Sequence, residues 1–217
     1  MPTKTAQDNV SKKRTLRRMF VLAVLVLCGV VATLWQVYVP QKAEESAQMV
    51  ETIKNARLTV ADADGSNLPP KPDVAAADAT VEGIDTNSNG IRDEVELAIF
   101  AKYPGPENLK LRAAALQYAK ALQMYLTSVF SKETLVAVSW QKSRGYFCVS
   151  ASIPAKPGPG ALDSEWKIFD AILREADQFV RVETLDTKSR TDKFEEVFEK
   201  YMMSHGSPDG NYCDLVW

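Results

Sequence analysis

A run of apolar residues near the N-terminus constrains this chain most. It extends from Met19 to Val39, 21 residues interrupted only by Gly29, Thr33 and Gln36. A helix needs about 20 such residues to cross the hydrocarbon core of a bilayer. The sequence therefore predicts a single transmembrane anchor at 19–39, which interacts directly with the lipid bilayer.

The flanks of this run predict its orientation. One acidic residue, Asp8, precedes the run, together with six basic residues: Lys4, Lys12, Lys13, Arg14, Arg17 and Arg18. Basic residues beside a transmembrane helix stay on the cytoplasmic side. We therefore expect residues 1–18 to form a cytoplasmic tail of a single-pass inner-membrane protein, with the C-terminal domain in the periplasm.

A cleaved signal peptide is the alternative interpretation of the same segment. Residues 19–28 would then be its hydrophobic region, and Val30-Val31-Ala32 offers small residues for cleavage. However, the apolar run continues past that point, and Trp35 and Tyr38 lie where an interfacial aromatic belt is expected. These features favour an uncleaved anchor over secretion.

A second feature, the twelve residues 85–96, has the spacing of a calcium-binding loop. Asp, Asn, Asn and Gly stand at loop positions one, three, five and six, and Glu at position twelve, which meets the EF-hand formula. Calcium takes 6 to 8 oxygen ligands, and Gly90 permits the sharp turn that brings them together. Ile91 would contribute its backbone carbonyl and the others their side chains. The predicted ligands are Asp85, Asn87, Asn89, Ile91, Asp93 and Glu96.

The loop resembles the single, helix-exiting calcium loops of dockerin and thrombospondin type 3 repeats. The chain has one such loop, position eight is Arg92 where paired EF-hands carry an aliphatic residue, and Gly83 interrupts the segment before it. The resemblance implies a structural calcium ion, because in those loops the ion stabilises the fold and does not trigger an opening movement. The alternative is a metal-free turn rich in Asp and Asn that caps the helix beginning near Arg92.

The wider arrangement is similar to that of a type of exported, membrane-anchored bacterial protein. The likeness rests on Leu68-Pro69-Pro70, on the stretch 80–85 (Thr-Val-Glu-Gly-Ile-Asp) and on 89–93 (Asn-Gly-Ile-Arg-Asp). It supports the loop assignment and implies no activity.

The three cysteines divide between two environments. Cys28 lies inside the predicted anchor, whereas Cys148 and Cys213 lie in the exported part. Disulfides persist in oxidising compartments, so we predict a bridge between Cys148 and Cys213, worth about 2–4 kcal/mol in the chain-entropy model. Two separate buried thiols are the alternative.

The charge balance of the exported part excludes one class of partner. Without the six basic residues and one acidic residue before the anchor, 20 basic and 27 acidic residues remain, a net charge of about −7. Nucleic-acid binding depends on Lys and Arg that neutralise phosphates. We therefore expect no nucleic-acid partner, and the charge suits a cation.

The remaining sequence predicts a mainly α fold. After a juxtamembrane helix at 40–57 comes a proline-containing linker at 58–84, and apolar residues recur at helical spacing through 92–217. On one long helix, expected between Pro106 and Ser131, this stripe comprises Leu111, Ala115, Tyr118, Leu122, Tyr125 and Val129. Ser131 should cap the next helix, ending near Cys148. An irregular bundle of four to five helices with one calcium loop is the predicted fold.

Function is less constrained than fold. No familiar catalytic motif occurs, so we assign no catalytic residue. A pocket lined by Tyr118, Tyr125, Trp166 and Phe169 is one hypothesis, but aromatic residues at helical spacing are more often core. We expect a membrane-tethered helical module with a structural calcium loop that binds another cell-envelope protein. A calcium-dependent envelope hydrolase is the alternative.

The predicted topology is directly testable. A reporter that is active only outside the cytoplasm should work when fused after Trp217, because the basic flank keeps the N-terminus inside. The protein should also sediment with membranes and retain its first residues. A soluble product beginning near Thr33 would contradict the anchor and establish a signal peptide.

Overall fold

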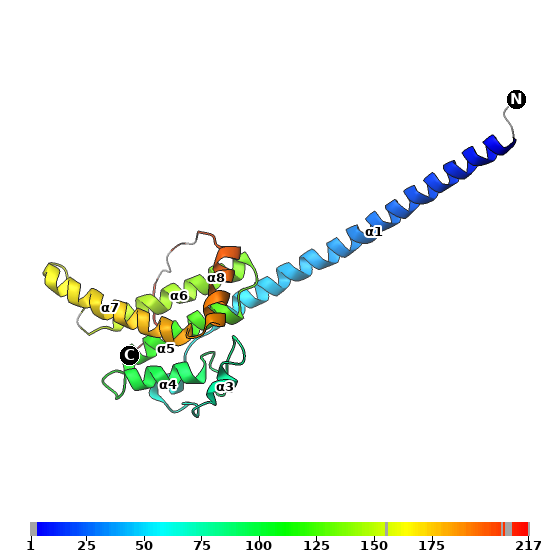
Figure 1. The fold of residues 1–217 in the computed structure, drawn as a ribbon. Helices are drawn as coiled ribbons and strands as arrows, with labels where there is room; N and C mark the ends of the chain where they lie inside the picture. The colour runs from blue at the N-terminus through cyan, green and yellow to red at the C-terminus, as the bar shows by residue number, and fades with distance from the viewer. Residues whose placement is uncertain (1–3, 155, 205, 207–209, 217) are drawn as a thin grey trace. The chain divides into compact units, whose positions relative to one another are not determined.

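The computed structural model describes residues 4–154, 156–204, 206 and 210–216. These residues are mainly helical and contain no strand (Figure 1). The helices are α1 (Lys4–Asn55), α2 (Val60–Asp64), α3 (Val74–Ala77), α4 (Asp93–Lys102), α5 (Leu109–Thr127), α6 (Lys132–Ser152), α7 (Asp163–Thr184) and α8 (Lys188–Tyr201). The chain forms two compact units, Met1–Glu45 and Ser46–Trp217, which we describe separately.

The first unit consists of the N-terminal part of α1. Among the described residues, α1 is the one helix long and apolar enough to cross a membrane. The apolar side chains described within 19–39 are exposed, including Phe20 and Trp35 at 70% and 68%. The helix continues through Pro40, where the sequence predicted the anchor to give way to a separate juxtamembrane helix. A proline removes one helical hydrogen bond, but here it does not end the helix.

The second unit is built around α5, which contacts α2, α4, α6, α7 and α8 (Figure 1). Five alanines of α5 are buried, which lets neighbouring helices approach closely: Ala113, Ala114, Ala115, Ala119 and Ala121. On the α6 side, a Cβ atom added to Gly145 would lie only 2.7 Å from the Cα atom of Tyr118. The close contact of α5 and α6 therefore depends on small residues on both helices.

The predicted stripe on α5 is buried, with Leu111 half-buried at its start. Its residues divide between two core clusters. Tyr118 lies in the larger cluster with α4 and α7, whereas Tyr125 lies in a smaller one with Ile53 of α1 and Val197 of α8. Because the two tyrosines belong to different clusters, they do not line one pocket. Tyr118, Tyr125 and Phe169 are core residues, whereas Trp166 is 40% exposed.

The predicted helix cap at Ser131 is confirmed. Its side chain accepts a hydrogen bond from the Thr134 backbone, and the Thr134 side chain accepts one in return, which is a capping box. The helix ends later than predicted, at Ser152, four residues beyond Cys148. Pro154 follows soon after, and the residue before a proline disfavours helical geometry.

The segment 58–84, predicted to be a linker, contains α2 and α3 and contributes buried residues such as Leu58 and Ala77. Two buried arginines from distant helices hold its backbone. On α5, Arg112 donates to the carbonyl of Ala63 at 2.9 Å. On α8, Arg190 donates to the carbonyl of Ala77 at 2.6 Å and forms an ion pair with Asp78. Polar contacts thus order a segment that has few apolar side chains.

Candidate metal centre

The loop beginning at Asp85 is folded by hydrogen bonds from backbone N–H groups to side chains. The Asp85 carboxylate accepts from the N–H groups of Asn89 at 3.1 Å and Gly90 at 2.8 Å, and the Asn89 side-chain oxygen accepts from Ile91 at 2.9 Å. Ser88 and Gly90 have left-handed backbones, with φ of 56° and 85°. The turn at Gly90 is therefore of the kind that glycine favours.

At the far end of the loop, Glu96 on α4 accepts hydrogen bonds from two side-chain amide groups. Its Oε2 atom accepts from the side-chain amide of Asn87 at 3.1 Å and of Asn89 at 2.9 Å. The side chain is fully buried, and its Oε1 atom has no hydrogen-bond partner among the described residues. A buried, unpaired carboxylate oxygen is costly, so this atom marks a place where a cation would be favourable.

Burial also changes the acidity of this carboxyl group. Burial raises the pKa of Glu96 from 4.5 to about 7; the two amide donors oppose the shift, and nearby Asp62 and Asp93 add to it. The protonated form therefore persists in the fold up to neutral pH unless positive charge is supplied.

The predicted ligands come together only in part. Hydrogen bonds join Asp85, Asn87, Asn89 and Glu96 in one network, and the Ile91 side chain lies in the core. In contrast, the Asp93 carboxylate accepts from both the backbone and the hydroxyl of Thr86, at 2.9 and 2.6 Å. No group of three His, Cys, Asp or Glu side chains suited to a metal ion occurs among the described residues.

Sequence reasoning missed the contribution of α2 to this site. Asp62 is buried and accepts from Thr59 and from the side-chain amide of Asn67. The carbonyl of Asn67 in turn accepts from the Asn87 amide at 2.6 Å. The pattern Thr59-x-x-Asp62 is a capping-box signal, which could have revealed the helix but not its position against the loop.

Lys120, on α5, lies beside the loop at Gly90. Lys120 donates to the Arg57 carbonyl at 3.0 Å, and its Cε atom would be 3.2 Å from a Cβ atom at Gly90. Burial lowers the pKa of Lys120, while Asp62, Asp214 and Asp85 oppose that shift. Beside it is a cavity of about 380 Å³ lined by loop residues and by α5. The positive charge of Lys120 would therefore repel a cation bound in the loop.

Arg92, at loop position eight, anchors the loop to the end of α7. Its side chain is buried and donates to the carbonyls of Thr184 at 2.9 Å and Glu183 at 3.1 Å. It also forms ion pairs with Glu94 and Asp186. This explains the departure from the paired EF-hand pattern, because this position binds the helical bundle.

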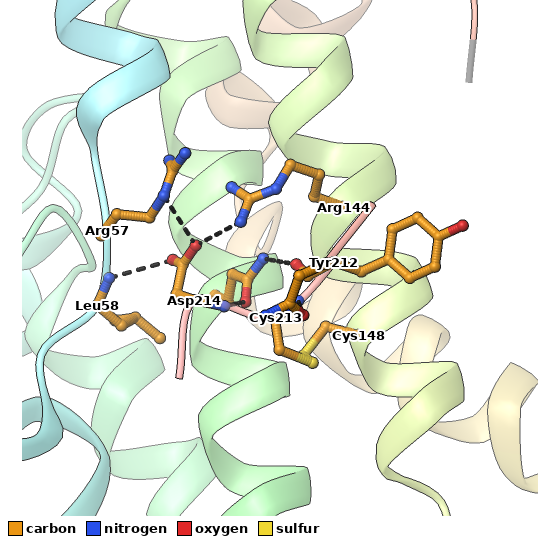
Figure 2. The surroundings of a disulfide bond; sticks show 9 residues. Arg57, Leu58, Arg144, Cys148, Tyr212, Cys213 and Asp214 are labelled. Atoms are coloured by element: carbon orange, nitrogen blue, oxygen red, sulfur yellow. Dashed lines mark hydrogen bonds and ion pairs between the residues drawn. A yellow bond between two sulfur atoms is a disulfide. The ribbon is translucent and has the colours of Figure 1, made fainter. Parts of the chain in front are cut away.

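The predicted disulfide between Cys148 and Cys213 is present, with a Cα–Cα distance of 4.9 Å (Figure 2). The adjacent Asp214 side chain is buried and accepts from Arg144 at 2.9 Å and from the N–H group of Leu58 at 3.1 Å, and it pairs with Arg57. The bridge and this carboxylate therefore fix the C-terminal tail to α6 and to the chain just after α1.

Comparison with profiles of protein families, with curated proteins and with solved structures gives no match for this chain.

The shifted pKa of Glu96 predicts how stability depends on pH. The folded-state pKa is raised above its unfolded value, so calcium-free protein should lose stability as pH rises from 4.5 to about 7. The loss is about 3 kcal/mol and is then constant at higher pH. Glu96→Gln cannot ionise and should lack this loss. Urea unfolding of the full-length protein in detergent and chelator, from pH 4.5 to 8, measures the difference.

The comparison between the two proteins removes the contribution of other titrating groups. As pH rises, the free energy of unfolding of Glu96→Gln should increase relative to that of wild type, until the variant is the more stable of the two. Parallel curves for wild type and Glu96→Gln would contradict the raised pKa.

Proposed function

We propose that this chain is a membrane-tethered, extracytoplasmic helical protein whose loop 85–96 binds one calcium ion as a structural element. The observation that carries the proposal is the buried Glu96 carboxylate, whose Oε1 atom has no partner among the described residues. It lies in a loop that already joins Asp85, Asn87 and Asn89.

The chemistry of this donor set fits calcium. Calcium prefers carboxylate, amide and carbonyl oxygens and tolerates irregular geometry. Glu96 and Asp85 would hold it, joined by the oxygens of Asn87 and Asn89, because each amide carries an acceptor oxygen as well as the N–H group that now donates. A bound ion would supply the positive charge that the buried Glu96 lacks. The Asp93 carboxylate accepts from Thr86, and it would act directly or through a water.

The surroundings of the loop favour a structural ion over a sensor. The exit helix α4 contributes Val95 and Ile99 to the core, and Arg92 fixes its start to the end of α7. An opening movement would expose these side chains and unpair the buried arginine, which is costly. We therefore propose that calcium locks the loop in place.

A cell-envelope protein is the partner class we propose. The α1 helix would hold the second unit beside a membrane, and a net charge of about −7 in the exported part argues against nucleic acid. A module of this kind, with no assigned catalytic residue, is best explained by protein interaction.

Calcium should stabilise the full-length protein in detergent. We expect a dissociation constant on the order of 10⁻⁵ to 10⁻³ M, because the loop supplies few carboxylates and Lys120 lies beside it. At a free calcium concentration 100 times this constant, the free energy of unfolding should increase by about 2.7 kcal/mol. Thermal unfolding in chelator and in millimolar calcium measures it. An unchanged melting temperature, or an equal calcium response of Glu96→Gln, would refute the site.

A charge variant tests the position of the ion. Lys120→Met should tighten calcium binding about two- to fivefold, because it removes a positive charge near Asp85. Lys110→Met, an exposed lysine on the same helix, is the matched control and should leave affinity unchanged. Calorimetric titration measures the calcium affinity of both variants. Equal affinities of Lys120→Met and Lys110→Met would place the ion away from Asp85.

The partner proposal needs a separate experiment. Crosslinking of intact cells, followed by capture of the full-length protein and mass spectrometry, should yield a stoichiometric envelope protein. The yield should fall for Glu96→Gln if calcium orders the binding surface. Absence of any partner, together with activity of the purified protein on envelope substrates, would favour the calcium-dependent hydrolase.

A further inference from the structure

An apolar groove lies on the second unit, and none of the loop residues 85–96 lines it. It has a volume of about 830 Å³ and runs between the last turns of α1, within residues 46–55, and α6. Its apolar walls are Val50, Val136, Ala137, Trp140 and Met203. Trp140 and Met203 are 37% and 47% exposed, so the apolar surface is open to a ligand.

One end of the groove carries an excess of positive charge. Arg57 and Arg144 both line it, and both pair with a single carboxylate, Asp214, at 3.4 and 2.9 Å. Figure 2 shows the two guanidinium groups approaching Asp214, one from the chain just after α1 and one from α6. Two positive charges thus share one negative charge. Burial and the neighbouring Arg144 lower the pKa of Arg57, in keeping with this crowding.

The other charged residues of the groove are already compensated. Lys54 forms an ion pair with Glu51 at 3.0 Å, and Glu133 lies in the first turn of α6, where the helix dipole favours a negative charge. From Glu133 to Arg144 the groove follows α6 for about 16 Å, at 1.5 Å per residue. The groove therefore has an elongated apolar stretch with a cationic end.

We propose that this groove binds a single-chain amphiphile with an anionic head, namely a long-chain fatty carboxylate. The acyl chain would lie along Val136, Trp140 and Met203, and the carboxylate would meet Arg57 and Arg144. Planar guanidinium groups bind carboxylates through paired hydrogen bonds. A pocket of this volume with apolar walls and placed polar groups is typical of small-ligand sites. The proposal does not depend on calcium binding.

Photolabelling maps such a site even when lipid is present. The probe is a fatty acid with a diazirine in its chain, added to the full-length protein in nanodiscs. Mass spectrometry should find labels on α6 around Trp140 and near Met203, apart from any on the apolar part of α1. Arg57→Gln should reduce the labelling of α6 about tenfold, because a charge-assisted hydrogen bond is lost. Arg174→Gln, an exposed arginine on α7, is the control and should change nothing.

Competition identifies the head group. Excess unlabelled fatty acid should abolish labelling of α6, whereas the alcohol of the same chain length should not. Equal competition by the alcohol, or competition only by a lysophospholipid, would overturn the carboxylate assignment. Labels confined to the apolar part of α1 would overturn the site itself. Because Arg57→Gln could disturb the C-terminal tail, an unchanged melting temperature is required of it. Trp140→Glu, which places a negative charge in the apolar wall, is a second test and should also reduce the labelling of α6.

Discussion

Arg190 is fully buried on α8, and its guanidinium group holds a stretch of chain that has little hydrophobic surface of its own. It donates to the carbonyls of Ala77 and Thr80 and pairs with Asp78 and Asp186. Backbone carbonyls removed from water need such partners. Arg112 does the same for Ala63, Tyr103 and Gly105 from α5. The connections between the helices are therefore held by arginine contacts as much as by apolar packing.

These contacts also position the candidate metal centre. Arg92 and Arg190 share Asp186, so the exit of the loop 85–96 and the segment around α3 are held by one carboxylate. On the other side, α2 is fixed by Arg112 and presents Asp62 and Asn67 to the loop. The loop is thus supported from both sides. This support keeps Glu96 out of water, which raises its pKa and makes a cation favourable there.

A chain of polar contacts connects the loop to the C-terminal tail. Lys120, beside Asp85, donates to the Arg57 carbonyl, and the Arg57 side chain pairs with Asp214 next to the disulfide. The same arginine lines the apolar groove. The loop, the C-terminal tail and the groove therefore all lie near Arg57 and Leu58, just after α1.

Local patterns in the sequence determined much of this protein. Apolar runs, helical spacing, the cap at Ser131 and the calcium-loop spacing are properties of neighbouring residues, and their physical consequences can be read directly. The pairing of Cys148 with Cys213 was predicted because they are the two cysteines outside the predicted anchor. Only the tertiary structure showed that 58–84 is ordered, that Asp62 stands near Glu96, and that Thr86 occupies Asp93. It alone placed Arg57 and Arg144 at one end of a groove. Each of these depends on contacts between residues distant in sequence, whose partners no local pattern specifies.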